Sequence, residues 1–435
     1  GKIGMPLAVA YLRKGCRVIG CDVSQQVVEA INAGICHIKE EPGLADVVAV
    51  AVSHGMFTAT QDTTSAVRAS EVVVVIVPVV TNEHNEIGFQ AIDAATAAIG
   101  AGLTPGKLVI YETTLPVGTT TQRLCQKLEQ GSHLIAGQEF YLAYSPERVR
   151  SGQILRDLAT YPKVVGGINK ASADAAAQFY RTVLDAEILE MGHTNDAEFV
   201  KLIETIYHDV NIALANEFAC YADTNGLDLH AAIAAANSHP QSHIHEPGIG
   251  VGGRCIPVYP YFLLNSTPAG LELARQARAI NNSMAAFAVE RIEADFGPLA
   301  FRSVLILGIA YRGDVRETFH STAQILKQEL VERGAAVYAH DPLFSDSDLE
   351  SLGYTPLKPE DKERVDAIIL QADHTAYQEW DFSQFPHCKL VLDGRRALRR
   401  EQIESCGMVY LHIGDGQQVR RSCEPIQAGG GQEAE

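Results

Sequence analysis

The sequence predicts an α/β protein in which two parallel-sheet segments flank a helical one. Both ends of the chain alternate near-continuous apolar strands with helices, a pattern typical of a parallel sheet covered on both faces. The middle is instead dominated by long helices with an apolar stripe. With 435 residues the chain is too long for a single hydrophobic core. We place the domain boundaries at residues 1–195, 196–294 and 295–435.

The first segment has the clearest alternation. Ser24 and Gly34 are the start and stop signals of a helix between them. Further helices are predicted at residues 88–103 and 119–130. Strands are predicted at residues 16–23, 71–79, 107–114, 140–149 and 162–167.

The other two segments follow their own patterns. Helices are predicted in the middle at residues 196–226, 227–238 and 272–297. The third segment returns to the first pattern, with a helix at residues 321–335. Its strands are predicted at residues 303–311, 336–342, 366–373 and 389–395.

Charge and cysteine usage exclude several classes of partner. The formal net charge is -18, and a field of that sign repels nucleic acid and anionic membranes. No apolar run reaches the ~20 residues that span a bilayer, and we recognise no signal peptide. The nine cysteines form no C-x-x-C pair. This argues against a metal site of paired thiols and fits a reducing cytoplasm.

The start of the chain carries half of a dinucleotide-binding motif. Gly1 and Gly4 have the spacing of the second and third glycines of G-x-G-x-x-G, which opens the first helix of a Rossmann domain. Asp22 closes the next strand, where a carboxylate binds the ribose hydroxyls of NAD and repels a 2′-phosphate. The alternative is a capped helix with a surface aspartate. Because the chain opens without a methionine, we expect the first strand upstream, and poor NAD binding without it.

Two strand ends also favour a cofactor site. Residues 77–81 include Pro78 and Thr81, and residues 112–118 include Thr114. Both stretches end apolar strands in small polar residues. The carboxyl ends of parallel strands form the edge that a dinucleotide crosses.

Cys255 ends the glycine-rich stretch GIGVGGRC. Glycines let a ligand approach closely, and a thiolate is a strong nucleophile and a good leaving group. Arg254 or Lys201 is a cation that can favour the thiolate. The alternative is an inert core cysteine. We interpret Cys255 as a nucleophile.

The first middle helix places Lys201, Thr205 and His208 near one face. On spacing alone, Lys201 is more typical of a lysine whose stem covers apolar surface than of a buried one that stabilises an oxyanion. Asn211 and Asn216 are either surface amides or hydrogen-bonding residues of a pocket.

Glu147 follows Pro146 just past a predicted strand. It is either a solvated carboxylate paired with Arg148 or Arg150, or an active-site group. Such groups gather at the strand ends of a parallel sheet.

These motifs together resemble the UDP-glucose/GDP-mannose dehydrogenase family along nearly the whole chain. The matching stretches are GKIGMPLAVA, ETTLPVGTT, YSPERV, KLIETIYHDVNIALANE, GVGGRCIPV, LGIAYRGDVRET and AHDP. SPERV followed by PKVVGG looks more like the members that oxidise UDP-N-acetylhexosamines, UDP-N-acetylmannosamine above all, than the UDP-glucose members.

The resemblance implies two Rossmann-like domains joined by a helical one, in an NAD-dependent oxidoreductase. The C6 alcohol of a UDP-sugar is converted to a carboxylate in a four-electron oxidation with two NAD. The nucleophile, which carries a thiohemiacetal and then a thioester, falls on Cys255. The oxyanion-stabilising lysine falls on Lys201, and the glutamate linked to thioester hydrolysis on Glu147. A cytoplasmic homodimer formed through the central helices, a role in polysaccharide biosynthesis and the absence of a metal are also implied.

The family binds the nucleotide mainly with its third domain and with the cysteine loop. The candidate substrate-binding residues are Arg148, Asn211, Gly252, Gly253, Arg254 and Tyr311. The candidate cofactor-binding residues are Gly1, Gly4, Asp22, Pro78, Thr81, Thr114 and Arg312.

The chain departs from the family near the reaction centre. Tyr259 replaces the aspartate four residues after the cysteine, and Thr205 the asparagine four residues after the lysine. Because tyrosine holds no negative charge near neutral pH, the base of the first oxidation is Lys201, a water held by Thr205, or Glu147. We count Thr205 and Tyr259 among the candidate catalytic residues of a divergent, active enzyme. The other replacements are Arg254 for histidine, Gln241 for arginine, Arg312 for lysine, and Phe319, His320, Ser321 and Thr322 for Arg-Glu-Ser-Pro.

Other functions stay open at this point. One is the same four-electron oxidation with UDP-glucose as substrate. Another is a two-electron dehydrogenase of the hydroxyacid type, which needs neither the cysteine loop nor a third domain. The last is a nucleotide-sugar binding protein without chemistry, which Tyr259 and the incomplete glycine motif motivate.

Overall fold

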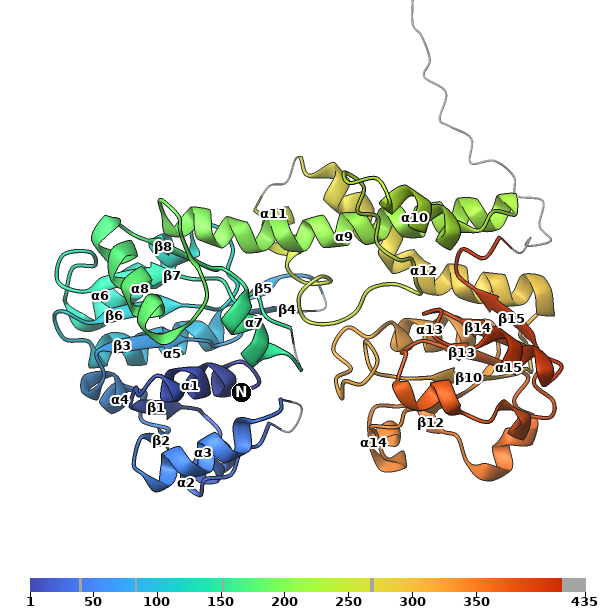
Figure 1. Cartoon of the computed structure of the whole chain (residues 1–435), viewed down its shortest axis with the longest axis horizontal. Helices are drawn as coiled ribbons and strands as arrows, with labels where there is room; N and C mark the ends of the chain where they lie inside the picture. The colour runs from blue at the N-terminus through green and yellow to red at the C-terminus, as the bar shows by residue number, and fades with distance from the viewer. Residues whose placement is uncertain (39–40, 83, 151, 267–269, 417–435) are drawn as a thin grey trace, which may run out of the picture. The chain divides into compact units, whose positions relative to one another are not determined.

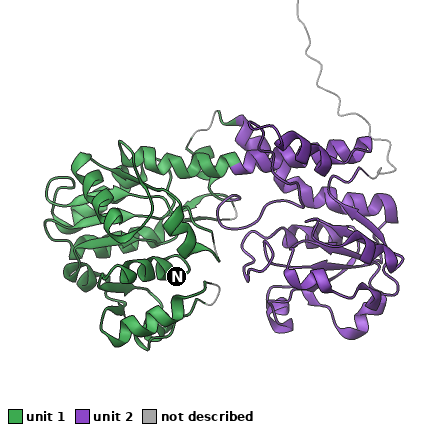
Figure 2. Cartoon of the chain, viewed as in Figure 1, with its two compact units in different colours: residues 1–207, 258–271 green, residues 208–257, 272–435 purple. Residues whose placement is uncertain are grey.

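The computed structural model describes residues 1–38, 41–82, 84–150, 152–266 and 270–416. The chain divides into two compact units (Figure 2). Unit 1 comprises Gly1–Tyr207 and Val258–Leu271, and unit 2 comprises His208–Pro257 and Glu272–Glu435. The predicted α/β class is confirmed, whereas the three domain boundaries stay a prediction.

Unit 1 contains a five-stranded sheet and a separate pair of parallel strands. The sheet has the order β3 (Val72–Val75), β6 (Leu108–Tyr111), β7 (Tyr141–Tyr144), β8 (Lys163–Gly167), β9 (Ile188–Glu190). The pair is β1 (Val18–Cys21) and β2 (Phe57–Thr60). A short antiparallel hairpin joins β4 (Val80–Thr81) to β5 (Ile87–Gly88).

The expectation of a wholly parallel sheet is wrong at one place in unit 1. β8 runs antiparallel to β7, with Ala143 opposite Gly167 and Tyr144 opposite Gly166. All five residues of β8 are buried. An apolar run therefore identifies a buried strand, but it carries no information about the strand's direction.

The helices of unit 1 cover these sheets (Figure 1). Two predicted helices are confirmed as α2 (Gln25–Asn32) and α5 (Gln90–Gly102), and a third as a π-helix, η1 (Thr120–Leu124), that continues into α6 (Cys125–Ser132). The Ser24 side chain accepts a hydrogen bond from the Val27 N–H and so caps α2. The remaining helices are α1 (Gly4–Arg13), α3 (Leu44–Ser53), α4 (Thr63–Ala69), α7 (Ile154–Thr160), α8 (Lys170–Val183) and α11 (Pro260–Leu264).

The long helices of the middle segment occur where the sequence predicts them. α9 (Thr194–Asn225) begins in unit 1 and ends in unit 2, where Gly226 has the positive φ typical of a helix end. α10 (Leu229–Asn237) is capped by Asp228, and α12 spans Glu272–Phe296. In the described ranges, none of the helices is long and apolar enough to cross a membrane.

Unit 2 contains a six-stranded parallel sheet with the strand order of a doubly wound domain. The order is β12 (Thr355–Pro356), β11 (Ala336–His340), β10 (Ser303–Leu307), β13 (Ala367–Leu370), β14 (Leu390–Asp393), β15 (Val409–His412). The chain begins in the middle at β10, goes outward to β12, and then crosses to β13. Such a sheet binds ligands where the order reverses, beyond the carboxyl ends of β10 and β13.

The core of unit 2 has two layers, one on each face of this sheet. Val304 and Ile306 of β10 pack in a cluster with α10, α12 and α13 (Thr322–Glu332). Leu305 and Leu307 point to the opposite face, toward Ile403 of α15 (Arg400–Ser405). The smaller elements on this sheet are α14 (Asp346–Ser351) and the 3-10 helices η2 (Pro359–Arg364), η3 (Thr375–Glu379) and η4 (Phe382–Gln384).

Candidate active site

The glycine-rich loop before Cys255 lies against the loop that follows β10. A Cβ atom on Gly252 would meet the His320 carbonyl oxygen and the Tyr311 Cβ, each at 2.8 Å. Gly253 has a φ of +96°, and a Cβ there would lie 3.0 Å from the Tyr311 ring. Its N–H also donates to the Phe319 carbonyl oxygen over 3.0 Å. The glycines are therefore needed for close packing of the two loops, which brings Gly252, Gly253 and Tyr311 together in unit 2.

Cys255 is exposed, so the alternative of an inert core cysteine is wrong. The neighbouring Arg254 pairs with Glu317, and its guanidinium carbon lies 4.6 Å from the centroid of the Phe319 ring. By contrast, burial raises the pKa of the Cys388 thiol to about 12. An exposed thiol beside a cation is the environment in which cysteine acts as a nucleophile.

Two buried amides and a buried ion pair hold the cysteine loop from the helix side. Asn216 accepts a hydrogen bond from the Gly248 N–H over 2.9 Å and donates to Asn281 over 2.9 Å. Arg278 pairs with Asp209 at 2.8 Å and donates to the Ile256 carbonyl oxygen over 3.4 Å. Asn216, which the sequence left undecided, is thus a buried anchor of the loop.

Asn211 has a different environment. Its amide nitrogen donates to the His243 carbonyl oxygen over 2.6 Å, and its amide oxygen accepts from the His245 N–H over 2.8 Å. Asn211, a predicted substrate-binding residue, therefore holds the segment of His243 and His245, which precedes the cysteine loop.

The edge of the unit 2 sheet is organised by Asp341. One oxygen of Asp341 accepts the N–H groups of Ile309 and Ala310, at 2.8 and 3.1 Å. The imidazole of His374, which follows β13, lies 3.1 Å from the same oxygen. The loop that carries Tyr311 and Arg312 is therefore held firmly at the point where the strand order reverses. Arg312 itself donates to the Tyr311 hydroxyl over 3.1 Å.

Arg395 follows β14 at the same edge and was missed by the sequence analysis. Its Nε donates to the Gln371 carbonyl oxygen over 2.8 Å, and a Cβ on Gly248 would lie 3.0 Å from its terminal nitrogen. A cation thus lies next to the cysteine loop. The sequence contains several arginines nearby and does not distinguish this one.

Three candidate cofactor-binding residues, Gly1, Gly4 and Asp22, lie together at the start of α1. The Ser24 N–H holds one Asp22 oxygen at 2.9 Å, and the other oxygen lies 3.9 Å from the Gly1 nitrogen. A Cβ on Gly4 would meet only Ile76, at an ordinary 3.7 Å, so packing within the protein does not require glycine there. A carboxylate beside a glycine-started helix fits the ribose and pyrophosphate of NAD.

The two predicted strand ends are also consistent with a cofactor. Pro78 and Thr114 follow β3 and β6, which are neighbours in the sheet. The Thr81 hydroxyl is buried and has no hydrogen-bond partner among the described residues. Because buried polar atoms are nearly always paired, this hydroxyl fits a ligand at the sheet edge.

Glu198 ties the loop after β6 to α9. Its carboxylate accepts hydrogen bonds from the Gly118 N–H at 2.5 Å and from the N–H and hydroxyl of Thr120 at 2.9 and 2.6 Å. Burial raises the pKa of Glu198 to about 7, although these hydrogen bonds lower it. The sequence does not reveal this role of Glu198, because its partners lie far away in the chain.

Glu198 predicts a pH dependence of stability. Its folded-state pKa of about 7 lies above the ordinary 4.5, so the folded state binds more protons between these pH values. The free energy of unfolding contributed by this group therefore falls as pH rises from 4.5 to 7, by at most about 3 kcal/mol. Urea unfolding at pH 5 and pH 7.5 should show a smaller difference for Glu198→Gln than for the wild type. Equal differences would contradict this prediction.

Lys201 and Thr205 lie one turn apart on α9. Thr205 is buried, and its hydroxyl donates to the Lys201 carbonyl oxygen over 2.8 Å. Its oxygen lone pairs stay available to hold a water. Lys201 is half-buried, and its ammonium forms no ion pair or hydrogen bond with the described residues, so this group is available to a ligand. Tyr259 is also half-buried and precedes α11.

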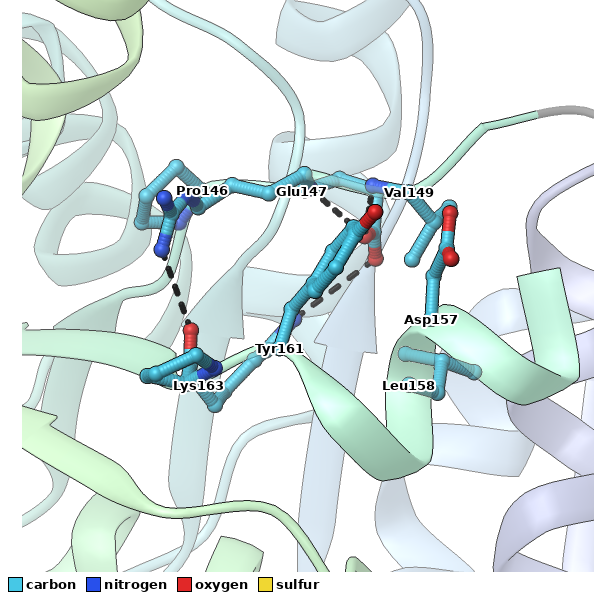
Figure 3. A pocket seen from close by; sticks show the side chains of 9 residues that line it. Pro146, Glu147, Val149, Asp157, Leu158, Tyr161 and Lys163 are labelled. Atoms are coloured by element: carbon cyan, nitrogen blue, oxygen red, sulfur yellow. Dashed lines mark hydrogen bonds and ion pairs between the residues drawn. The ribbon is translucent and has the colours of Figure 1, made fainter. Parts of the chain in front are cut away.

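Glu147 lies in a pocket of unit 1 rather than in solvent (Figure 3). One of its oxygens accepts the N–H groups of Arg148 and Val149, at 2.7 and 3.1 Å. The other oxygen lies 3.6 Å from the ammonium of Lys163. The alternative of a carboxylate paired with Arg148 or Arg150 is not what the structure shows. Arg148 pairs instead with Glu204 at 3.0 Å.

Comparisons with known proteins match the parts of the chain that carry these candidate site residues. The chain matches the UDP-glucose/GDP-mannose dehydrogenase family in three parts: its NAD binding domain at residues 1–184, its central domain at residues 195–283 and its UDP binding domain at residues 305–400.

Individual relatives are similar over nearly their full length. A UDP-N-acetyl-D-mannosamine dehydrogenase of Pyrococcus horikoshii is 32% identical over 427 residues, which are 96% of this chain and 98% of the relative. The solved structure of the UDP-D-ManNAc dehydrogenase from that organism superposes with a TM-score of 0.86, at 31% identity, over 96% of this chain and 98% of that one. A UDP-glucose dehydrogenase of Pyrobaculum islandicum has a TM-score of 0.85 at 26% identity, over 95% and 96% of the two chains.

Proposed function

The chain belongs to the UDP-glucose/GDP-mannose dehydrogenase family, and on this premise we propose that it oxidises the C6 alcohol of UDP-N-acetylmannosamine to the carboxylate. The family and its relatives are NAD-dependent oxidoreductases that act on the alcohols of nucleotide sugars. The sugar is inferred from similarity to the relatives named for it.

The observation that carries the proposal is the exposed Cys255 in a glycine loop packed on the edge of the unit 2 sheet. A two-electron dehydrogenase of the hydroxyacid type has no use for such a thiol. A four-electron oxidation needs a nucleophile, because the aldehyde must be held covalently before its second oxidation.

The chemistry follows from this thiol. NAD, when bound, accepts one hydride in each of the two oxidations. The Cys255 thiolate adds to the C6 aldehyde as a thiohemiacetal, and this becomes a thioester when its hydride leaves. The Lys201 ammonium stabilises the oxyanion formed at each stage. Water then hydrolyses the thioester, the carboxylate leaves, and Cys255 is regenerated as the thiolate.

The departures from the family fit an active enzyme with altered proton transfer. Thr205 is placed to hold a water with its lone pairs, one helical turn from Lys201. Such a water is suited to take the alcohol proton of the first oxidation in place of the missing aspartate at Tyr259. Residues of unit 2 at the switch point, among them Tyr311 and Arg395, are suited to bind the UDP group.

We also infer a homodimer formed through α9. This helix exposes large apolar side chains at intervals of three, four and seven residues, the spacing of one helical face. A monomer rarely leaves such a stripe in water, and a second copy of the helix covers it. Sedimentation velocity tests the inference. The exposed residues are Phe199, Ile203, Tyr207, Leu214, Phe218 and Tyr221.

Counting NADH per sugar consumed tests the proposed reaction. The full-length protein is mixed with NAD and, separately, with UDP-N-acetylmannosamine, UDP-N-acetylglucosamine or UDP-glucose. We expect two NADH per sugar, with the highest kcat/KM for UDP-N-acetylmannosamine. One NADH per sugar would support the two-electron alternative. Stabilisation by the sugar nucleotide without any NADH would support a binding protein.

A further inference from the structure

A buried lysine joins Glu147 to a second, deeper carboxylate. Lys163 is the first residue of β8, and its ammonium lies 2.9 Å from Glu112 at the end of β6 and 3.6 Å from Glu147 beyond β7. In Figure 3 the Glu147 carboxylate and the Lys163 side chain point toward one another. The Lys163 ammonium also lies 5.1 Å from the centroid of the Tyr180 ring. Three neighbouring strands thus bring one cation between two carboxylates.

The cluster is almost closed to water. The exposed fractions of the side chains are 0% for Glu112, 7% for Lys163 and 13% for Glu147. Both carboxylate oxygens of Glu112 have hydrogen-bond donors: Lys163 donates to one, and the Tyr180 and Tyr11 hydroxyls donate to the other. In Glu147, by contrast, the oxygen that faces Lys163 accepts no hydrogen bond from the described residues. Glu147, the least buried of the three, has a carboxylate oxygen without a hydrogen bond and lines the pocket together with Lys163.

Charge balance decides what the lysine does. Two carboxylates and one ammonium cannot all be ionised without leaving a net buried negative charge. Burial raises the pKa of Glu112, whereas the two carboxylates raise that of Lys163 against the effect of burial. The ionised Lys163 therefore offsets the charge of one carboxylate, and the raised pKa of Glu112 disfavours a second buried negative charge at that residue.

We propose that Lys163 is a positioning residue for Glu147, holding its carboxylate in place through their ion pair for the hydrolysis of the Cys255 thioester. This rests on the proposed function. In that step Glu147 accepts a proton from water while the water oxygen bonds to the thioester carbon. The carbon–sulfur bond then breaks, and its electron pair leaves with Cys255 as the thiolate. Without the ammonium, the Glu147 carboxylate would lose its cationic neighbour at 3.6 Å, and a neighbouring cation favours the charged form of a carboxyl group, the form that can take that proton.

Other charged or titratable groups also face this carboxylate. Within the described part of unit 1 they come from α1, β6, the segment after β7, α7, β8 and α8. They are Tyr11, Glu112, Arg148, Asp157, Tyr161, Lys163 and Tyr180. Arg148 is paired with Glu204, and Asp157 with Arg150. Lys163 is therefore the cation in this set whose partners are the two buried glutamates.

The test compares three variants over pH with UDP-N-acetylmannosamine and NAD. In Lys163→Met, the acidic limb of the kcat profile should move up by about one pH unit or more, since a cation this close shifts a carboxyl pKa by 1–3 units. On the acidic side of this limb, kcat should fall about tenfold for each pH unit by which the limb moves. Mass spectrometry should find the sugar acyl group accumulated on Cys255. Lys163→Arg should restore the limb, and Glu112→Gln should not raise it.

The different pH profiles expected for Lys163→Met and Glu112→Gln distinguish a positioning role of Lys163 from a purely structural one. An unmoved acidic limb in Lys163→Met, or an equal loss at every pH in Lys163→Met and Glu112→Gln, would overturn the inference. If Lys163→Met does not fold, the double variant with Glu112→Gln removes the cation and its buried counter-charge together and should still move the limb. Failure of the proposed function is visible separately, as fewer than two NADH per sugar in the wild type.

Discussion

Cys255→Ala is expected to reduce formation of the carboxylate on the order of 10³-fold or more. Without the thiol no thiohemiacetal or thioester forms, so the second oxidation loses its covalent intermediate. Binding of the nucleotide sugar should change little, because the loop is held by Asn216 and Arg278 rather than by the thiol. The product is measured by mass spectrometry, and NADH by absorbance, over many turnovers.

Cys406→Ala is the matched control. Cys406 is half-buried at the end of α15 and packs against the core on one face of the unit 2 sheet. Its replacement should leave activity within a few-fold of the wild type. If Cys255→Ala and Cys406→Ala form the carboxylate product at similar rates, the reaction does not proceed through a Cys255 thioester.

Arg291→Met is expected to destabilise unit 2 by about 3–5 kcal/mol, because it leaves two carboxylates buried without their cation. Arg291 of α12 is 1% exposed and lies 2.8 Å from Asp223 of α9 and 2.8 Å from Asp415. It also donates to the His412 carbonyl oxygen of β15 over 2.6 Å. The free energy of unfolding is measured in urea.

An exposed ion pair of the same unit provides the comparison. Arg302 lies 3.5 Å from Asp366, and the two side chains are 42% and 22% exposed. Arg302→Met should therefore change the free energy of unfolding by less than about 1 kcal/mol. If Arg291→Met and Arg302→Met unfold at the same urea concentration, burial of the Arg291 ion pairs does not determine how much they contribute to the free energy of unfolding.

The sequence predicts those parts of the fold that are encoded locally. Each predicted strand and each middle helix is present, because an apolar run or stripe records burial directly. Two of the elements that it missed have weak local signals, because β9 has three residues and α8 is rich in alanine and polar residues. The direction of β8 also escaped prediction, because direction depends on the connection and not on the strand.

The candidate site shows the same difference between features that the local sequence encodes and features that depend on distant residues. The glycines make the cysteine loop stand out in the sequence, but the structure gives Gly252 and Gly253 a different role from the predicted approach of a ligand, because they pack against Tyr311 and His320, which lie far away in the chain. Glu198 and Lys163 were missed, because each acts through partners about 80 and 51 residues away in the chain. Spacing in a sequence shows which side chains share a helix face, but not which distant carboxylate a buried lysine will meet.

The position of Asp415 has a consequence for how the protein is made. It neutralises a buried arginine that lies 124 residues earlier in the chain. At about 5–20 residues per second, a ribosome needs roughly 6–25 seconds to add that length. During this time Arg291 lacks one of its two carboxylates, and β15 has not joined the sheet edge. Unit 2 therefore completes its folding only after Asp415 has been made, and a nascent chain stalled before Asp415 should be a better chaperone client than one extended well past it.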